Sequence, residues 1–163
     1  MAANTTITLN KDQLLYDIQN ITYTVGLNRS TGANFEQVAN IQNNGQDGDL
    51  DIILRSIEAG FNEIKRNVNR FISETTASST NTITTSTGTF TLQLTMPGNF
   101  NQASVDSIKS ASHDYIVAHA LIDWFSAVKP DEVAIYVQKK ADAGVNILSA
   151  IYRKKAPSRP AQA

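Results

Sequence analysis

The sequence predicts a mainly α-helical protein: a bundle of about four helices with a β-hairpin inserted between the second and third long helices. Two observations predict the bundle, an apolar seam sustained over residues 49–72 and two further helical patterns joined by a Lys129-Pro130-Asp131 corner. A third predicts the hairpin, because the composition changes abruptly to Ser and Thr over residues 73–95, and these residues disfavour helix. A chain of 163 residues suffices for one domain with its own core.

The first helix is expected to begin at Asn10, since apolar residues follow at spacings of four, three and four, namely Leu14, Ile18, Ile21 and Val25. Before it, Thr5 to Leu9 are either a short strand or a flexible arm that becomes ordered against a neighbour. A long Asn- and Gly-rich connection follows, in which a short helix near Phe35 is expected because long connections without structure are uncommon.

The second helix, Asp49 to Ile72, has the clearest pattern in the chain. Its apolar residues alternate steps of four and three, and they are Leu50, Leu54, Ile57, Phe61, Ile64, Val68 and Phe71. Acidic residues at its start and Arg66 and Arg70 at its end suit the helix dipole. This seam predicts one face buried against the rest of the bundle.

The hairpin is expected at about residues 82–96, with strands on either side of Thr87-Gly88. In the second strand the apolar residues Phe90, Leu92, Leu94 and Met96 alternate with polar ones, so they share one face. A lone hairpin is marginally stable in water, so this face should lie against protein. We expect part of that burial to be against a neighbouring subunit.

Two long helices end the chain, one from Ser104 to Val128 and one from Asp131 to Lys155. The first has two adjacent apolar stripes, so it should pack against more than one neighbour. In the second, the expected seam contains small residues that permit close helix contact, and it consists of Ala134, Val137, Ala141, Gly144, Leu148 and Ile151. The predicted core of the bundle comprises Leu54, Ile57, Phe61, Ile64, Leu121, Ile122, Phe125, Val137, Leu148 and Ile151. We expect a single domain over residues 1–156 and an extended tail over 157–163.

Composition and charge exclude several classes of protein. With 14 basic and 15 acidic residues the formal charge is −1, so global electrostatics do not draw the chain to nucleic acid. The absence of cysteine excludes disulfides, thiolate zinc sites and cysteine nucleophiles. The start of the chain lacks a signal-peptide pattern, and the longest apolar run is too short and too interrupted to span a bilayer. These features indicate a soluble protein of the cytoplasm or of a particle assembled there.

No pattern in the sequence predicts a catalytic or metal site. The stretch from Asn43 to Asp51 resembles a calcium loop, but Leu54 stands where the closing carboxylate belongs, so a turn before an acidic helix start is favoured. His113 and His119 are six residues apart and lie on different sides of a helix. We therefore expect no enzyme activity, no cofactor and no metal.

The only dense basic cluster is at the end of the chain: Tyr152, Arg153, Lys154, Lys155 and Arg159, with prolines at 157 and 160. Two interpretations remain open. The charges either complement the dipole at a helix end and continue as a solvated tail, or they form an extended arm that docks on a partner or approaches DNA phosphates.

The last third of the chain carries a family resemblance. Its residues are Ala120-Leu121-Ile122-Asp123-Trp124-Phe125, Pro130-Asp131-Glu132, Tyr136, Ala141-Asp142-Ala143 and Tyr152-Arg153-Lys154-Lys155 with Pro-x-Arg-Pro. With the order of elements, this ending resembles the head–tail connector (adaptor) proteins of tailed bacteriophages. The Asn- and Thr-rich, cysteine-free style is similar to the neck ring proteins of crAss-like phages.

The resemblance implies a structural virion protein in the phage neck, assembled in the host cytoplasm. Such proteins form a closed ring, with about twelve copies to match a portal, between the portal or capsid and the tail. Genomic DNA passes through the channel without sequence-specific binding, and no membrane is involved. The resemblance further implies that the hairpin reaches a neighbouring subunit, and that the arm from Tyr152 to Pro160 contacts the portal or an adjacent ring.

Other classes fit part of the pattern. A tail-completion or other tail structural protein would share the composition and differ in its place in the particle. A small DNA-binding protein would need a contiguous basic face, for which Arg55, Lys65, Arg66 and Arg70 are the candidates. A bundle enzyme would need a carboxylate cluster facing inward, whereas the acidic residues fall mainly on polar faces.

Overall fold

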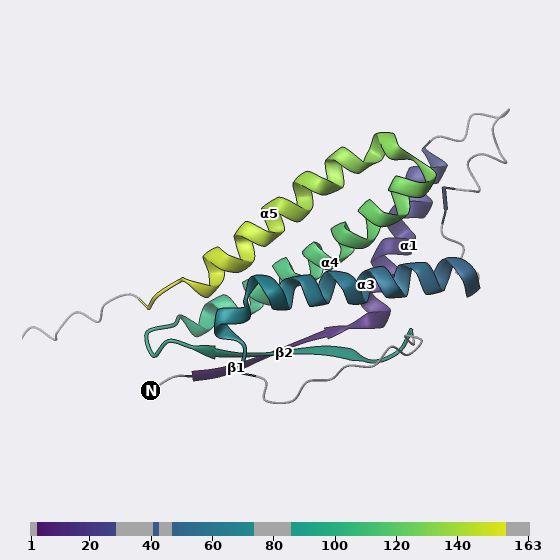
Figure 1. Cartoon of the computed structure of the whole chain (residues 1–163). Helices are drawn as coiled ribbons and strands as arrows, with labels where there is room; N and C mark the ends of the chain where they lie inside the picture. Colours follow the sequence, from purple (N-terminus) through teal and green to yellow (C-terminus); the bar gives the residue numbers. More distant parts are fainter. Residues whose placement is uncertain (1–2, 29–40, 43–46, 74–85, 156–163) are drawn as a thin grey trace, which may run out of the picture.

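The structure, a computed structural model, describes residues 3–28, 41–42, 47–73 and 86–155. Strand β1 (Ala3–Asn10) leads directly into helix α1 (Lys11–Leu27), and helix α3 (Asp47–Asn67) ends in a short 3-10 turn. Strand β2 (Thr89–Met96) precedes helix α4 (Val105–Val128), and helix α5 (Val133–Ile151) follows the proline corner. Four long helices and two strands therefore make up the described fold, which confirms the mainly helical class (Figure 1).

The strand pairing differs from the expected hairpin. β2 pairs antiparallel with β1, in a register that runs from Ala3 opposite Met96 to Asn10 opposite Thr89. The expected partner strand around Thr82 to Thr85 lies outside the described residues. Thr5 to Leu9 therefore belong to a strand, and this N-terminal strand is the partner of β2 in the two-stranded sheet. Sequence patterns did not predict this pairing because alternation identifies a strand without naming its partner.

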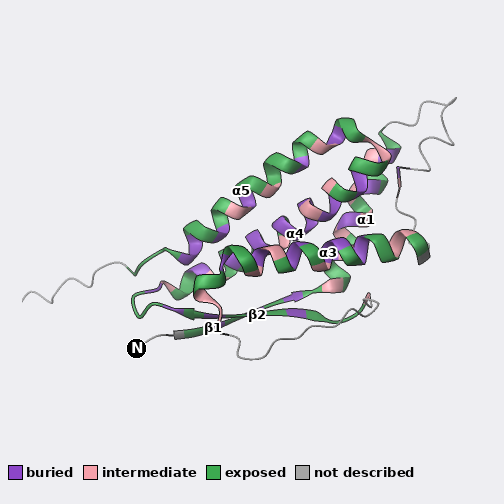
Figure 2. Cartoon of the chain, in the orientation of Figure 1, coloured by how far each residue is buried: buried purple, intermediate pink, exposed green. Residues whose placement is uncertain are grey.

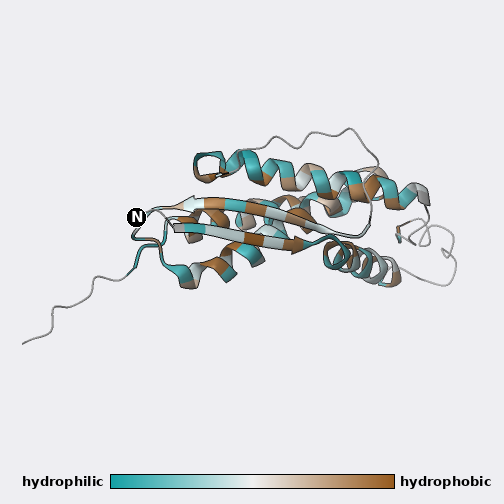
Figure 3. Cartoon of the chain, turned by 90° about the horizontal axis from the view of Figure 1, so that it is seen from below, coloured by the Kyte–Doolittle hydropathy of each residue, from teal (hydrophilic) through white to brown (hydrophobic). Residues whose placement is uncertain are grey.

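The inner face of the sheet is buried within the single chain. Phe90, Leu92, Leu94 and Met96 have exposed fractions of 8%, 1%, 0% and 0%, and Ile7 and Leu9 from β1 are buried beside them. Figure 3 shows hydrophobic and hydrophilic residues alternating along both strands, with the helices behind. The prediction that the β2 side chains face protein is confirmed. The chain's own fold already covers these side chains, so it leaves little of this face for the expected contact with a neighbouring subunit.

α4 is the central helix, and its two apolar stripes pack against different neighbours, as predicted. α3, α1 and α5 all contact it, and so does β1. Phe61 of α3 stacks on Phe90 of β2 with ring centroids 4.6 Å apart, which joins the helices to the sheet. Near the C-terminal end of α4, Trp124 donates a hydrogen bond from Nε1 to the carbonyl oxygen of Ile41 at 2.9 Å.

Seven of the ten predicted core residues are buried: Leu54, Ile57, Phe61, Ile64, Leu121, Phe125 and Ile151. Ile122 is half-buried against the core.

α5 buries a different face from the one predicted. Its buried residues are Tyr136, Ala143, Ile147, Ala150 and Ile151, whereas Val137 and Leu148 are 50% and 38% exposed. Tyr136 stacks on Phe125 of α4 at 5.3 Å, which fixes this rotation of the helix. The helix also ends at Ile151, four residues before the expected end at Lys155. Val137 and Leu148 must therefore be removed from the predicted core, and Figure 2 shows exposed residues along the outer side of α5.

Candidate functional site

The basic segment Tyr152–Lys155 lies at the end of the molecule where β1 begins (Figure 1). Its backbone is fixed by two hydrogen bonds: the amide of Asn101 donates to the carbonyl of Arg153 at 3.0 Å, and the amide of Lys155 donates to the carbonyl of Asn99 at 2.8 Å. This short antiparallel pairing ties the segment to the turn between β2 and α4. Up to Lys155, the segment is therefore docked on the chain itself and is not a free arm.

The side chains of this segment remain available at the surface. Tyr152 is 58% exposed and meets Phe71 edge-on, with ring centroids 5.5 Å apart. Arg153, Lys154 and Lys155 are all exposed. A rigid backbone that presents three adjacent basic side chains is suited to docking on an acidic partner. The fifth predicted docking residue, Arg159, lies outside the described part of the chain.

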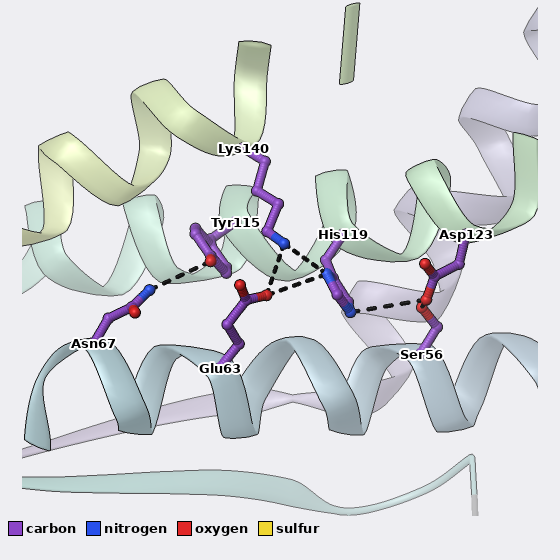
Figure 4. A network of polar contacts seen from close by, with 7 residues as sticks. All are labelled: Ser56, Glu63, Asn67, Tyr115, His119, Asp123 and Lys140. Atoms are coloured by element: carbon purple, nitrogen blue, oxygen red, sulfur yellow. Dashed lines mark hydrogen bonds and ion pairs between the residues drawn. The ribbon is translucent and has the colours of Figure 1, made fainter. Parts of the chain in front are cut away.

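A second polar feature joins three helices. Lys140 on α5 reaches between the helices, where its Nζ lies 2.7 Å from Oε2 of Glu63 on α3 and 2.9 Å from Nδ1 of His119 on α4 (Figure 4). All three side chains are largely buried, with exposed fractions of 27% for Glu63, 21% for Lys140 and 17% for His119. The cluster therefore forms a charged link among α3, α4 and α5 inside the bundle.

The cluster extends along the contact between α3 and α4 in both directions. Toward one end, the Ser56 hydroxyl donates to a carboxylate oxygen of Asp123, and Nε2 of His119 lies 3.7 Å from the same oxygen. Toward the other end, Nδ2 of Asn67 donates to the phenol oxygen of Tyr115 at 3.3 Å. The seven residues thus make a row of polar contacts in an otherwise apolar interface.

The surroundings hold His119 in its neutral form. Burial lowers the pKa of His119 below its ordinary 6.5, and the positive charge of Lys140 lowers it further, against the opposing effect of the nearby carboxylates. Because Lys140 donates to Nδ1, the neutral ring carries its proton on Nε2, facing Asp123. For Glu63, burial acts to raise the pKa, but the hydrogen bond and charge of Lys140 outweigh it and leave the pKa below 4.5.

This geometry suits cohesion between helices better than catalysis. The Ser56 hydroxyl bonds to a carboxylate, whereas a nucleophilic serine needs contact with a general base such as imidazole. Lys140 contacts the Glu63 carboxylate at 2.7 Å, so its amine is already engaged within the bundle. The groove of about 380 Å³ between α1, α4 and α5 is lined by Asp114, Asp142 and Lys139 among others, and the cluster does not line it.

Sequence reasoning missed this cluster and interpreted His119 and Asp123 separately. A signal was present, because His119 and Asp123 are four residues apart on α4 and therefore share a face. Their partners Glu63 and Lys140 come from other helices, and no spacing in the sequence connects them.

The cluster predicts that the protein loses stability in acid. The unfolded chain takes up a proton on histidine near pH 6.5, whereas folded His119 takes it up only at lower pH. The stability that neutral His119 contributes is therefore complete above about pH 6.5 and decreases as the pH falls toward the folded pKa; Glu63 adds a further loss below 4.5. Urea unfolding between pH 7.5 and 5 should show the first loss, and His119→Gln should reduce it. An unchanged pH dependence in His119→Gln would show that another group is responsible.

A third candidate site is the exposed apolar stripe on the outer side of α5, which contains three of the six residues of the predicted seam. We call this the α5 stripe, and it consists of Val137, Ala141, Val145, Leu148 and Tyr152. Val145 and Val137 are 66% and 50% exposed. Steps of four, four, three and four residues place the five on one helix face, about 22 Å long at 1.5 Å per residue. An aligned, exposed apolar face of this kind is a candidate interaction surface.

Metal binding and membrane insertion find no support in the described residues. Within residues 3–28, 41–42, 47–73 and 86–155, no three His, Asp or Glu side chains lie close enough to hold a metal ion. The described helices include none long and apolar enough to cross a membrane. The first four residues of the calcium-like stretch, 43–46, fall outside the described ranges.

The chain matches no protein-family model, no characterised protein and no solved structure. The fold and surfaces therefore define it only as a helical bundle on a two-stranded sheet, with an exposed apolar helix face and a basic end.

Proposed function

We propose that this protein is a structural subunit of a bacteriophage neck, where it forms a ring that joins the portal and capsid to the tail and leaves a passage for genomic DNA. The observation that carries the proposal is the α5 stripe. A periodic apolar face is ordinarily buried, and in the single chain this one is exposed over the length of the helix. Packing against other protein chains would cover it.

The basic end supports the same proposal through the portal contact. Arg153, Lys154 and Lys155 project from a backbone that is already ordered, so docking on an acidic portal surface would cost little conformational entropy. The resemblance of the last third of the chain to connector proteins supplies the particular place in the particle. In this role the charged cluster of Glu63, His119 and Lys140 keeps the subunit rigid, and no catalytic step is required.

Val145→Asp tests the proposal on the stripe itself. The substitution places a charge at the centre of an apolar interface, so we expect it to abolish assembly while the free chain stays folded, because Val145 is 66% exposed. Asn146→Asp is the matched control, since it adds the same charge at the next exposed position, outside the stripe. Light scattering and electron microscopy of each protein, alone and with the purified portal, measure the outcome.

Two results would contradict the proposal. One is unchanged ring formation and portal binding in Val145→Asp, and the other is a position outside the neck when the native particle is viewed by electron microscopy. Location in the tail would favour the alternative role as a tail-completion or other tail structural protein.

A further inference from the structure

A second exposed apolar face lies on α1, on the side opposite its buried residues. We call it the α1 face, and it consists of Tyr16, Asn20, Tyr23 and Leu27. Tyr16, Tyr23 and Leu27 are 60%, 52% and 48% exposed. Leu14 and Ile18, which point the other way, are fully buried in the core. Among the described residues, the α1 face and the α5 stripe are therefore two apolar helix faces that remain uncovered.

We propose that these two faces bind each other between neighbouring copies: the α1 face of one copy packs antiparallel on the α5 stripe of the next. The inference rests on the proposed ring, and it names the two surfaces that would build it. A contact between two different surfaces of the same chain is a head-to-tail contact, which closes into a ring when its rotation divides a full turn.

The spacing of the two faces is compatible with this pairing. The α1 face advances by four, three and four residues from 16 to 27, and the α5 stripe has the same steps from 141 to 152. Read in opposite directions, they place Tyr23 beside Val145 and Leu27 beside Ala141. At these two contacts a large side chain of α1 meets a small or branched residue of α5, as ridges fit into grooves in packed helices, and the same register places Asn20 beside Leu148 and Tyr16 beside Tyr152.

Charge favours the antiparallel direction. Asp12 lies one turn before Tyr16 on the same face of α1, and in this alignment it lies toward the C-terminal end of the neighbouring copy's α5, which is followed by the exposed basic residues Arg153, Lys154 and Lys155. Antiparallel helices also place opposite dipole ends together. A parallel arrangement would instead bring Asp12 to the start of α5, beside the exposed Asp131.

The main competing arrangement is a two-fold pair in which α5 binds α5. It would cover the α5 stripe, but it would leave Tyr16 and Tyr23 exposed on both copies. The head-to-tail arrangement covers both faces with one type of contact.

Cysteine cross-linking distinguishes the arrangements cleanly, because the natural chain contains no cysteine. In the double variant Tyr23→Cys with Val145→Cys, mild oxidation should link successive copies and give a ladder of dimers, trimers and larger species on a non-reducing gel. Each single variant should remain uncrosslinked. The control pair Tyr23→Cys with Asn146→Cys should give no ladder, because Asn146 lies on another side of α5. All three positions are exposed, so the variants should fold, and thermal unfolding checks this.

The outcomes separate this inference from the proposed function. Dimers from Val145→Cys alone would overturn it in favour of α5 self-pairing. Rings visible by electron microscopy without a ladder in the double variant would overturn the α1–α5 contact and leave the ring proposal standing. No assembly of the wild-type chain, alone or with the portal, would overturn both.

Discussion

Ile147→Ala is expected to lower the free energy of unfolding by about 2–5 kcal/mol, the usual cost of deleting a large aliphatic side chain from a packed core. Ile147 is 3% exposed, and it lies on the face of α5 that packs on α4. Removing three carbons there leaves a cavity that a helix anchored by Tyr136 and Ile151 cannot easily close. Urea denaturation of the free chain measures the effect.

Leu148→Ala, one residue further, is the matched control. Leu148 is 38% exposed on the outer side of α5, so its truncation should cost well under half as much in the free chain. It should weaken assembly instead, because it belongs to the α5 stripe. Equal losses of stability at 147 and 148 would show that the helix is rotated differently from the structure described above.

The second large effect is expected for Leu94→Ala in the centre of β2. Leu94 is fully buried, and it lies opposite Thr5 of β1. We expect a loss of about 2–5 kcal/mol that does not depend on protein concentration, because the burial is within one chain. Unfolding curves at two concentrations a hundredfold apart provide the measurement.

Thr91→Ala is the control on the same strand, since Thr91 points outward and is exposed. It should cost about 1 kcal/mol or less, mostly through β-propensity. If the loss at Leu94 appeared only at high protein concentration, the sheet face would be an inter-subunit surface after all.

Local sequence patterns predicted the elements well because each pattern depends on near neighbours in the chain. The apolar residues of α3 recur every three or four positions, so Leu54, Ile57 and Ile64 had to share a face. Alternation in β2 likewise placed Phe90 and Leu92 on one side. The proline corner before α5 and the central, doubly packed character of α4 were predicted for the same reason.

Contacts between distant residues could not be predicted in this way. β1 and β2 are separated by about eighty residues, and nothing local in either strand identifies the other. The link from Lys140 to Glu63 and His119 joins three helices, and a lysine on a helix surface usually points to water. The same limit explains why the pairing of Arg153 and Lys155 with the turn between β2 and α4 was not predicted, and why the helix was expected to continue to Lys155.

α5 shows most clearly what each level decides. Its sequence determined that the helix has two apolar faces, one with Tyr136, Ile147 and Ile151 and one with Val137 and Leu148. Periodicity cannot rank two such faces, because it measures only their direction around the helix axis. The tertiary structure decided between them: α4 meets α5 along the apolar stripe that contains Phe125, and stacking of Tyr136 on Phe125 places the first face there. The second face is left exposed because α4 contacts α5 on one side only. The apolar face of the sheet cannot cover it either, since that face is already packed against α3 and α4.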